Sequence, residues 1–269
     1  MPKKPDAYYR PENMTEALRL LSQPDTIALG GGTKLLATEA GVAQAGVVDL
    51  QALGLNQVER KGDRLQIGAS ITLTGLSQIV QKEEASAAGT QLLLKGIHQA
   101  GPNTYRNSAT LGGTIASRLN DSELLSTLLI LETELILLSP QAYKISLSDY
   151  LQGEDAPKGL ISEISVSWID GQGVSERVAR TPADYPIVSI TCWRPAGGSI
   201  RLAGTGLGPR PFGLTAAEDV LQGGVNEQSI EAAAEAASGA SMHLGDFRGD
   251  AAYRAEMAAV LTRRVLRQM

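Results

Sequence analysis

Cysteine is almost absent from this sequence, and its scarcity excludes several kinds of site. The single cysteine, Cys192, rules out an internal disulfide, a four-cysteine iron–sulfur cluster held by this chain alone and a cysteine-rich zinc site. Histidine is nearly as rare, because only His98 and His243 are present, and they are too isolated to indicate a metal site. Cys192 falls in an alternating stretch typical of a half-buried strand, so we expect a thiol in the core.

Aromatic residues, an excess of basic charge and long apolar runs are also missing. Aromatic residues make up 4% of the chain, so aliphatic side chains must dominate its cores. With 24 basic and 29 acidic residues the formal net charge is −5, which argues against nucleic acid or an anionic membrane surface as the main partner. No stretch approaches the roughly 20 apolar residues of a membrane span, and the N-terminus lacks the apolar core of a signal peptide. We therefore expect a cytoplasmic protein without a membrane span.

Two glycine runs are present, but neither belongs to the two commonest nucleotide-binding motifs. Neither run fits the dinucleotide fingerprint G-x-G-x-x-G or a P-loop. Gly30-Gly31-Gly32-Thr33 follows the apolar stretch 26–29, and Gly112-Gly113-Thr114 follows the stretch 108–110, which we read as a second strand. A glycine turn after a strand brings bare N–H groups close to an anionic or planar ligand. Each run alone is as compatible with a flexible turn, but the pair predicts two loops that hold a pyrophosphate-containing cofactor.

The remaining pattern predicts alternating strands and helices up to about residue 168 and a change of character near Asp170. We expect a helix capped by Asn13, strands at 26–29, 47–50, 64–69 and 132–138, and helices at 76–94 and 123–131. Beyond residue 170 we expect strands at 187–193 and 199–203 and helices at 229–237 and 250–268. The last helix is predicted to have an apolar face of Tyr253, Met257, Val260 and Leu261, with Arg254 on its polar side. We place a domain boundary at about residue 169, although the length alone also permits a single domain.

Both glycine runs lie in longer motifs that resemble one known family. The segment 28–36, ALGGGTKLL, is similar to the first FAD loop of the FAD-binding subunits of molybdenum hydroxylases, and 105–117, YRNSATLGGTIAS, is similar to the second. These subunits are the medium subunits of aerobic carbon monoxide dehydrogenase and its relatives, and the flavin domain of xanthine dehydrogenase. The segments 246–254 and 260–266 resemble the C-terminal domain of the same family, so the similarity covers essentially the whole chain.

The resemblance implies an α+β fold with FAD bound between two subdomains. A two-subdomain, PCMH-like FAD-binding module is expected at 1–169, with subdomains of about 1–55 and 56–169, followed by an antiparallel sheet packed with helices at 170–269. The residues that correspond by position to the family's FAD contacts are Leu29, Gly30, Gly31, Gly32, Thr33, Lys34, Thr110, Leu111, Gly112, Gly113, Thr114, Ala116, Ser117, Glu123 and Ile161.

The resemblance also implies roles for these positions. The two loops would give amides and hydroxyls to the diphosphate and to nearby ribityl oxygens, and Ile161 would pack beside the isoalloxazine. Glu123 stands where the family usually has a flavin-binding aspartate; Asp121 is an alternative, and Glu123 is otherwise a first-turn residue that favours the helix dipole. Lys34 replaces the usual Asp, Asn or Ser and either adds a cation near the diphosphate or marks a changed site. Thr114 replaces the usual Asn.

The function implied by the resemblance is electron transfer through FAD. In the family, a large molybdenum subunit with molybdopterin oxidises the substrate, and a small subunit with two 2Fe-2S clusters relays the electrons to FAD. The flavin then passes them to an external acceptor. We therefore expect a hetero-oligomeric oxidoreductase in which this chain contributes no general acid or base. Two alternatives are an interaction subunit that no longer holds FAD and a free-standing flavin oxidoreductase.

Overall fold

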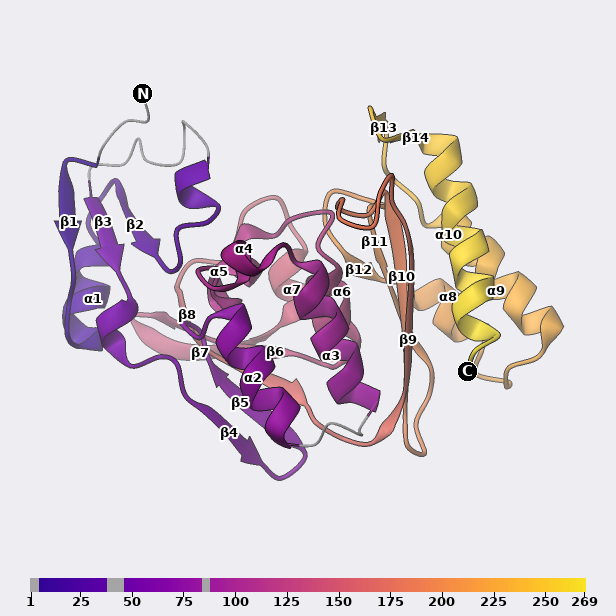
Figure 1. Ribbon diagram of the computed structural model, residues 1–269, viewed down its shortest axis with the longest axis horizontal. Helices are drawn as coiled ribbons and strands as arrows, with labels where there is room; N and C mark the ends of the chain where they lie inside the picture. Colours follow the sequence, from indigo (N-terminus) through magenta and orange to yellow (C-terminus); the bar gives the residue numbers. More distant parts are fainter. Residues whose placement is uncertain (1–4, 38–45, 84–87) are drawn as a thin grey trace.

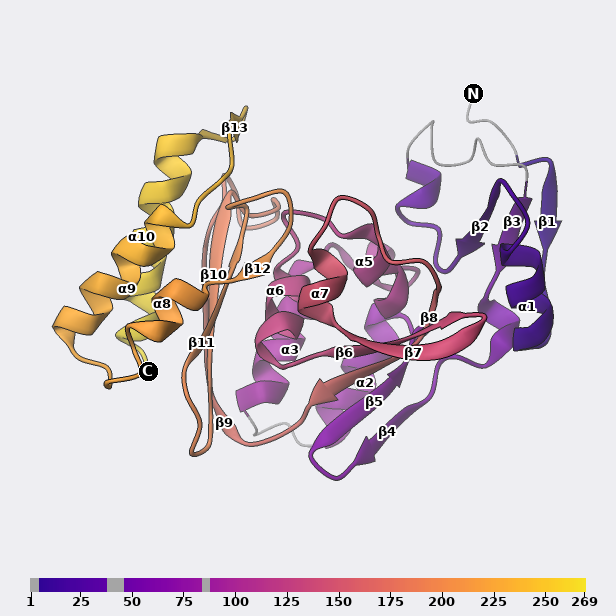
Figure 2. The same ribbon diagram turned by 180° about the vertical axis from the view of Figure 1, so that it is seen from behind.

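The three larger β-sheets of the described residues follow one another along the long axis of the protein, in the order of the sequence (Figure 1). The computed structural model describes residues 5–37, 46–83 and 88–269. Helices lie between the second and third sheets and on the outer side of the third, so the protein has the α+β architecture that the sequence predicts. The view from behind shows the same sequence of layers (Figure 2).

The first sheet is small and parallel. Its strands lie in the order β1 (Ala7–Tyr9), β3 (Gly46–Asp49) and β2 (Thr26–Leu29). Helix α1 (Met14–Leu21) begins at Asn13, whose side chain accepts a hydrogen bond from the N–H of Glu16 at 2.9 Å, as predicted. Short 3-10 turns follow at η1 (Leu35–Ala37) and η2 (Gln51–Leu53). Ligands of parallel sheets bind outside the carboxyl ends of the strands, which is where the glycine run 30–32 leaves β2.

The second sheet is antiparallel, in the order β4-β5-β8-β6-β7. Its strands are β4 (Val58–Lys61), β5 (Arg64–Gly68), β6 (Glu134–Ser139), β7 (Gln141–Ser146) and β8 (Leu160–Ser167). Its helices are α2 (Leu73–Glu83), α3 (Ala88–Gln99), α4 (Asn103–Arg106), α5 (Leu111–Ser117), α6 (Glu123–Ile130) and α7 (Leu147–Leu151). The helix predicted over 76–94 is therefore two helices, α2 and α3, and its residues 84–87 lie outside the described part.

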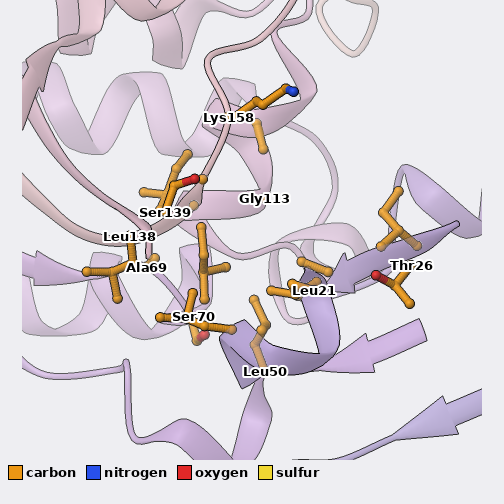
Figure 3. Close-up of a pocket in the computed structure, with 18 of the residues that line it drawn as sticks. Leu21, Thr26, Leu50, Ala69, Ser70, Gly113, Leu138, Ser139 and Lys158 are labelled. Atoms are coloured by element: carbon orange, nitrogen blue, oxygen red, sulfur yellow. The ribbon is translucent and has the colours of Figure 1, made fainter. Parts of the chain in front are cut away.

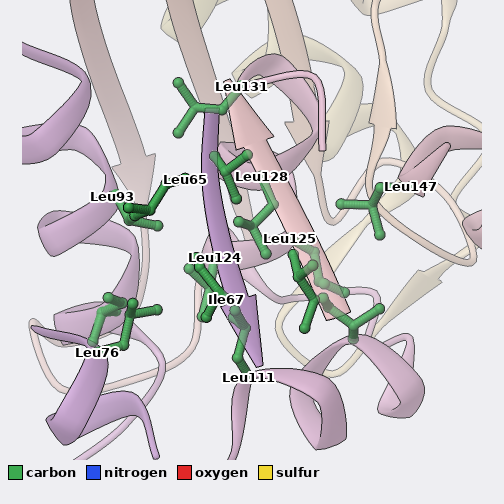
Figure 4. Close-up of a cluster of buried hydrophobic side chains, with 14 of the residues drawn as sticks. Leu65, Ile67, Leu76, Leu93, Leu111, Leu124, Leu125, Leu128, Leu131 and Leu147 are labelled. Carbon is green, nitrogen blue, oxygen red and sulfur yellow. The ribbon is translucent and has the colours of Figure 1, made fainter. Parts of the chain in front are cut away.

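The main core is aliphatic and fills the space between the second sheet and its helices (Figure 4). Strand β5 alternates, with Leu65 and Ile67 buried against leucines from α2, α3, α5 and α6. At about 25 cal/mol for each Å² of apolar surface removed from water, these leucines supply the main driving force for folding here. The N-terminus of α5, which carries the second glycine pair, is thereby fixed by Leu111, which is fully buried.

The third sheet is antiparallel and lies between two layers of helices. Its strands are ordered β12 (Phe212–Gly213), β11 (Arg201–Thr205), β10 (Val188–Pro195) and β9 (Gly171–Val178). Helices α3 and α6 pack on one side of this sheet, and α8 (Thr215–Asp219) and α10 (Ala251–Leu266) pack on the other. Helix α9 (Glu227–Gly239) packs against α8 and α10. Strands β13 (Gly245–Asp246) and β14 (Gly249–Asp250) form a hairpin before α10. Cys192 is fully buried on β10 as predicted, and burial raises the pKa of its thiol to about 12.

The buried face of α10 differs from the predicted one at Arg254. Tyr253, predicted to face the core, is 38% exposed, whereas Arg254, predicted on the polar side, is fully buried. Its guanidinium donates to the carbonyl oxygens of Ile187 and Gly206 and, at 2.7 Å, to Oδ1 of Asp246. These acceptors come from the ends of strands and from the hairpin, so a charged side chain occupies the helix face that periodicity assigns to solvent.

We predict that Arg254→Met lowers the free energy of unfolding by roughly 3 to 5 kcal/mol, because it leaves two buried carbonyl oxygens without their donor and removes one of the two arginines that pair with Asp246. Arg267→Met, at the residue that caps the C-terminus of the same helix, is the control. Arg267 is 51% exposed in its pair with Glu227, so its loss should cost less than about 1 kcal/mol. Urea unfolding of both variants measures the difference, and equal values would contradict this role of Arg254.

Candidate functional site

A cavity of about 690 Å³ lies between the first and second sheets (Figure 3). Leu21 and Leu50 line it from the side of the first sheet, and Ser139 and Lys158 lie on the opposite side. This volume lies within the range of roughly 300–1,000 Å³ that holds small organic ligands and cofactors. Among the described residues that line it there is no carboxylate, and Lys158 is the one charged side chain. The cavity therefore suits a neutral or anionic ligand with apolar parts.

The two glycine runs meet beside this cavity, and their contact leaves no room for side chains. A Cβ atom added to Gly30 would lie 2.7 Å from Oγ1 of Thr110, and one added to Gly31 would lie 1.6 Å from the carbonyl oxygen of Ser108. Gly32 has a φ of 72°, which L residues with side chains rarely adopt. The sequence prediction that the two runs form one site agrees with this geometry.

The backbone N–H groups of the two runs differ in what they bind. In the part of the chain that the structure describes, the N–H groups of Gly30, Gly31, Gly32 and Thr33 have no protein acceptor. N–H groups without partners need water or a ligand, because leaving them dry costs free energy. The first run therefore presents a row of free donors, which is the arrangement that binds phosphate oxygens.

The second run is built differently from the prediction. No strand precedes it: residues 103–106 form α4, Thr110 makes only an isolated bridge with Thr72, and Gly112 and Gly113 lie inside α5. The N–H of Leu111 donates to Ile71, that of Gly112 to Ala69 and that of Gly113 to Oγ1 of Thr110, at 2.8–3.1 Å. The strand-then-glycine interpretation is thus wrong for this run, because these donors already have partners.

Helix α5 nevertheless presents an open face to the site. Gly113 and Ala116 are exposed and Ser117 is half-buried, three positions that helical spacing places on one side. A Cβ at Gly112 would lie 2.7 Å from that of Ala69, so this glycine allows α5 to approach β5 closely. The second run therefore shapes the wall of the site, whereas the first run supplies its free N–H groups.

The structure brings only some of the predicted FAD contacts to the cavity. Those that line it are Gly30, Thr110, Gly112, Gly113, Ala116 and Ile161. Gly31, Gly32, Thr33 and Lys34 continue along the first run beyond the cavity, and Ser117 lies on the next turn of α5. Leu29 ends β2 and Leu111 is in the core, while the hydroxyl of Thr114 is buried and donates to the carbonyl oxygen of Thr110 at 2.9 Å. Their contacts with a cofactor stay predictions.

Several lining residues lie outside the predicted set. The hydroxyl oxygen of Ser70 is buried beside the cavity without a hydrogen-bond partner among the described residues. It follows β5, one residue beyond the alternating stretch 64–69 that the sequence predicts as a strand. Leu18 and Leu21 come from the apolar side of α1, and Lys158 comes from the loop before β8, which carries no motif. Apolar residues at helical spacing predict a buried helix face, so no local signal in the sequence assigns these side chains to a cavity.

Lys34 joins the first run to two other parts of the protein. Its ammonium nitrogen lies 5.3 Å from the centre of the Tyr105 ring and 5.4 Å from that of the Tyr185 ring, both within the range of cation–π contacts. Tyr105 belongs to α4, and Tyr185 belongs to the loop between β9 and β10 of the third sheet. Lys34, which replaces the Asp, Asn or Ser usual in the family that the sequence resembles, therefore places a cation where three parts of the chain meet.

The structure places Glu123 outside the cavity. It is the first residue of α6 and only 3% exposed, and its Oε2 lies 3.2 Å from Nη1 of Arg177 on β9. Burial raises the pKa of this carboxyl to about 7, against the lowering effect of the Arg177 and Lys95 charges. Asp121, the alternative to Glu123, pairs with Arg248 at 3.0 Å, and Arg248 also pairs with Asp246. Both carboxylates thus connect the second sheet's helices to the third sheet's unit.

Comparison with known protein families finds one matching family for each of the two parts of the chain. The family described as FAD binding domain in molybdopterin dehydrogenase matches residues 3–167, and the CO dehydrogenase flavoprotein C-terminal domain matches residues 177–269. The chain is 27% identical over 278 residues to the glyceraldehyde dehydrogenase medium chain of Sulfolobus acidocaldarius, covering 98% of each.

Solved structures agree over nearly the whole length. A carbon monoxide dehydrogenase from Hydrogenophaga pseudoflava that lacks the Mo-pyranopterin moiety has a chain with a TM-score of 0.89 and 26% identity, covering 99% of this chain and 97% of that one. Quinoline 2-oxidoreductase from Pseudomonas putida 86 gives a TM-score of 0.85 at 22% identity, with 97% and 95% covered, which shows the shared fold. Among the described residues, no helix is long and apolar enough to span a membrane, and no group of three or more His, Cys, Asp or Glu side chains is placed to hold a metal.

The buried Glu123 predicts a specific pH dependence of stability. Below the ordinary pKa of 4.5 the carboxyl is protonated in both the folded and the unfolded chain. Between pH 4.5 and about 7 only the unfolded chain releases the proton, so the free energy of unfolding falls as pH rises, by about 3 kcal/mol in all. Glu123→Gln should remove this part of the slope, since Arg177 keeps its bond to the carbonyl oxygen of Asp184.

Urea unfolding of the wild type, Glu123→Gln and Glu227→Gln between pH 4.5 and 8 measures the effect. Glu227 is exposed, so its variant should retain the wild-type slope. A Glu123→Gln slope equal to that of the wild type would show that this carboxyl does not titrate near pH 7.

Proposed function

This chain belongs to the family of FAD-binding domains in molybdopterin dehydrogenases, and we propose that it is the electron-transfer subunit of a molybdenum-containing hydroxylase. It is an FAD-binding medium subunit in fold and in sequence. The proposal adds the direction of electron flow: from a 2Fe-2S partner subunit to FAD, and from FAD to an external acceptor. It also includes a large molybdenum subunit, a cytoplasmic location and the division of the chain near residue 169.

The observation that carries the proposal is the row of free N–H groups at Gly30, Gly31, Gly32 and Thr33. This row lies between the cavity and the Lys34 junction, and the open face of α5 lies opposite Gly30 through Thr110. A ligand with phosphates at its centre and an organic group at each end matches such a row. FAD has this composition, with a diphosphate between adenosine and the flavin.

The residues present fit FAD in charge and in space. A carboxylate-free cavity avoids repulsion of the diphosphate, and the unpartnered Ser70 hydroxyl offers a hydrogen bond to the ligand part inside. We assign the adenine to the aliphatic cavity, beside Leu21, Leu50 and Ile161. The flavin would then extend past Thr33 towards Tyr105 and Tyr185, whose rings are suited to stacking. In this orientation Ile161 would contact the adenine, whereas the resemblance implies a contact with the isoalloxazine, and that contact stays a prediction.

When bound, FAD supplies the redox chemistry, accepting electrons and passing them on. The chain's own residues would bind and orient it: the first run would hold the phosphates, α5 would form one wall, and the aliphatic lining would keep water from the adenine. The medium chain of the Sulfolobus enzyme supports assembly with other chains, because a medium chain implies larger and smaller ones.

The two alternatives receive less support. An interaction subunit without FAD was suggested by the departures at Lys34, Thr114 and Glu123. However, the Thr114 and Glu123 side chains do not line the cavity, so changes there leave the N–H row intact. For a free-standing flavin oxidoreductase, the likeness to a medium chain counts against it, because a medium chain is one part of a larger enzyme.

FAD titration of the purified chain, followed by flavin absorbance and fluorescence, tests the proposal. We expect about one FAD for each chain. Gly31→Ala should weaken FAD binding at least tenfold, because the new methyl group would displace the first run from Ser108 and spread the N–H row. Gly223→Ala is the matched control, because a Cβ there meets nothing within 4 Å, and it should bind FAD as the wild type does.

The proposal fails if the wild-type chain stays colourless with excess FAD, both alone and after co-expression with its 2Fe-2S partner. Equal affinities of Gly31→Ala and wild type would keep the flavoprotein but remove the first run from the site.

A further inference from the structure

Lys34 carries a charge that no carboxylate among the described residues of its junction neutralises. It is half-buried, and among the described residues it has no carboxylate within ion-pair distance; its contacts are the ring faces of Tyr105 and Tyr185. Ring faces attract a cation but leave its formal charge unbalanced. A half-buried cation of this kind has a stronger effect on a nearby ligand than an exposed one, because water screens it less.

The neighbouring cations are already committed to other groups. Arg248 is paired with Asp121 and Asp246. Arg106 donates to the carbonyl oxygens of His98 and Gly101 and to Asn103. Arg118 donates to the carbonyl oxygens of residues 151–154. Within the described part of this junction, Lys34 is therefore the cation available to a ligand.

The position of Lys34 along the chain indicates which part of the ligand it meets. The free N–H row ends at Thr33, and Lys34 follows directly and is not among the residues that line the cavity. In the orientation proposed above, the adenosine end fills the cavity and the flavin end extends past Thr33. Tyr185 is 37% exposed, so this end also lies near the surface, where electrons can enter and leave.

We propose that Lys34 binds the reduced flavin more tightly than the oxidised flavin and so raises its reduction potential. Two electrons and one proton convert the neutral isoalloxazine to an anion whose charge lies on the pyrimidine ring. The electrons come from the iron–sulfur partner in the enzyme, or from dithionite in the test. A cation held beside that ring stabilises the reduced form selectively. This inference rests on the proposed function, because it requires bound FAD.

The test uses the full chain loaded with FAD, in the wild type, Lys34→Met, Lys34→Gln and Lys34→Arg. The midpoint potential is measured by dithionite titration against a reference dye, and the dissociation constant of oxidised FAD by fluorescence. Lys34→Met and Lys34→Gln should bind reduced FAD at least tenfold more weakly relative to oxidised FAD, which lowers the potential by about 30 mV or more. Lys34→Arg should stay near the wild type. Lys82→Met, which changes an exposed lysine on α2, is the matched control and should leave the potential unchanged.

Each outcome separates this inference from the proposed function. If the wild type binds FAD and both neutral variants keep its potential, the inference is wrong and the flavoprotein assignment stands. If the neutral variants lose affinity equally for oxidised and reduced FAD, Lys34 holds the phosphates, and the inference is again overturned. If the wild type binds no FAD, the proposed function fails, and the inference fails with it.

Discussion

The contact between Gly31 and the carbonyl oxygen of Ser108 is the constraint on which the site depends. Two backbones touch there without an intervening side chain, so the first sheet and α5 come close enough to share one ligand. Among the described residues, the N–H groups of residues 30–33 have no protein acceptor at this contact. Such donors are costly unless water or a ligand satisfies them. The proposed hydrogen bonds to the phosphates thus come from backbone N–H groups, and few side chains are needed to hold the phosphates.

The third sheet is connected to this site through charged and aromatic side chains. Glu123 meets Arg177, Asp121 meets Arg248, and Lys34 lies on the ring of Tyr185. Each contact joins a residue near α5 or the first run to the C-terminal part of the chain. The C-terminal unit therefore does more than cover α3 and α6. It fixes the surroundings of the proposed flavin end, and changes in its loops should reach the cofactor.

Local patterns in the sequence predicted some of this arrangement well and missed the rest for identifiable reasons. The first run was predictable because an apolar strand followed by glycines determines its own geometry. The second run was assigned free N–H groups, but Ala69 and Ile71, some forty residues earlier in the chain, accept them. Arg254 was assigned to solvent for a similar reason, since its carbonyl partners lie 48 and 67 residues away. Ser70 and Lys158 lie outside both glycine motifs, and only the folded chain places them at the cavity.

Amide hydrogen exchange with and without FAD tests the central claim most directly, because it reports on individual N–H groups. The account predicts that the amides of residues 31–33 exchange fast in the FAD-free chain and become protected when FAD binds. The amides of residues 111–113 should be slow in both states, because protein acceptors already hold them. Fast exchange at 111–113 that FAD suppresses, with residues 31–33 unaffected, would contradict the account and return the phosphates to the second run.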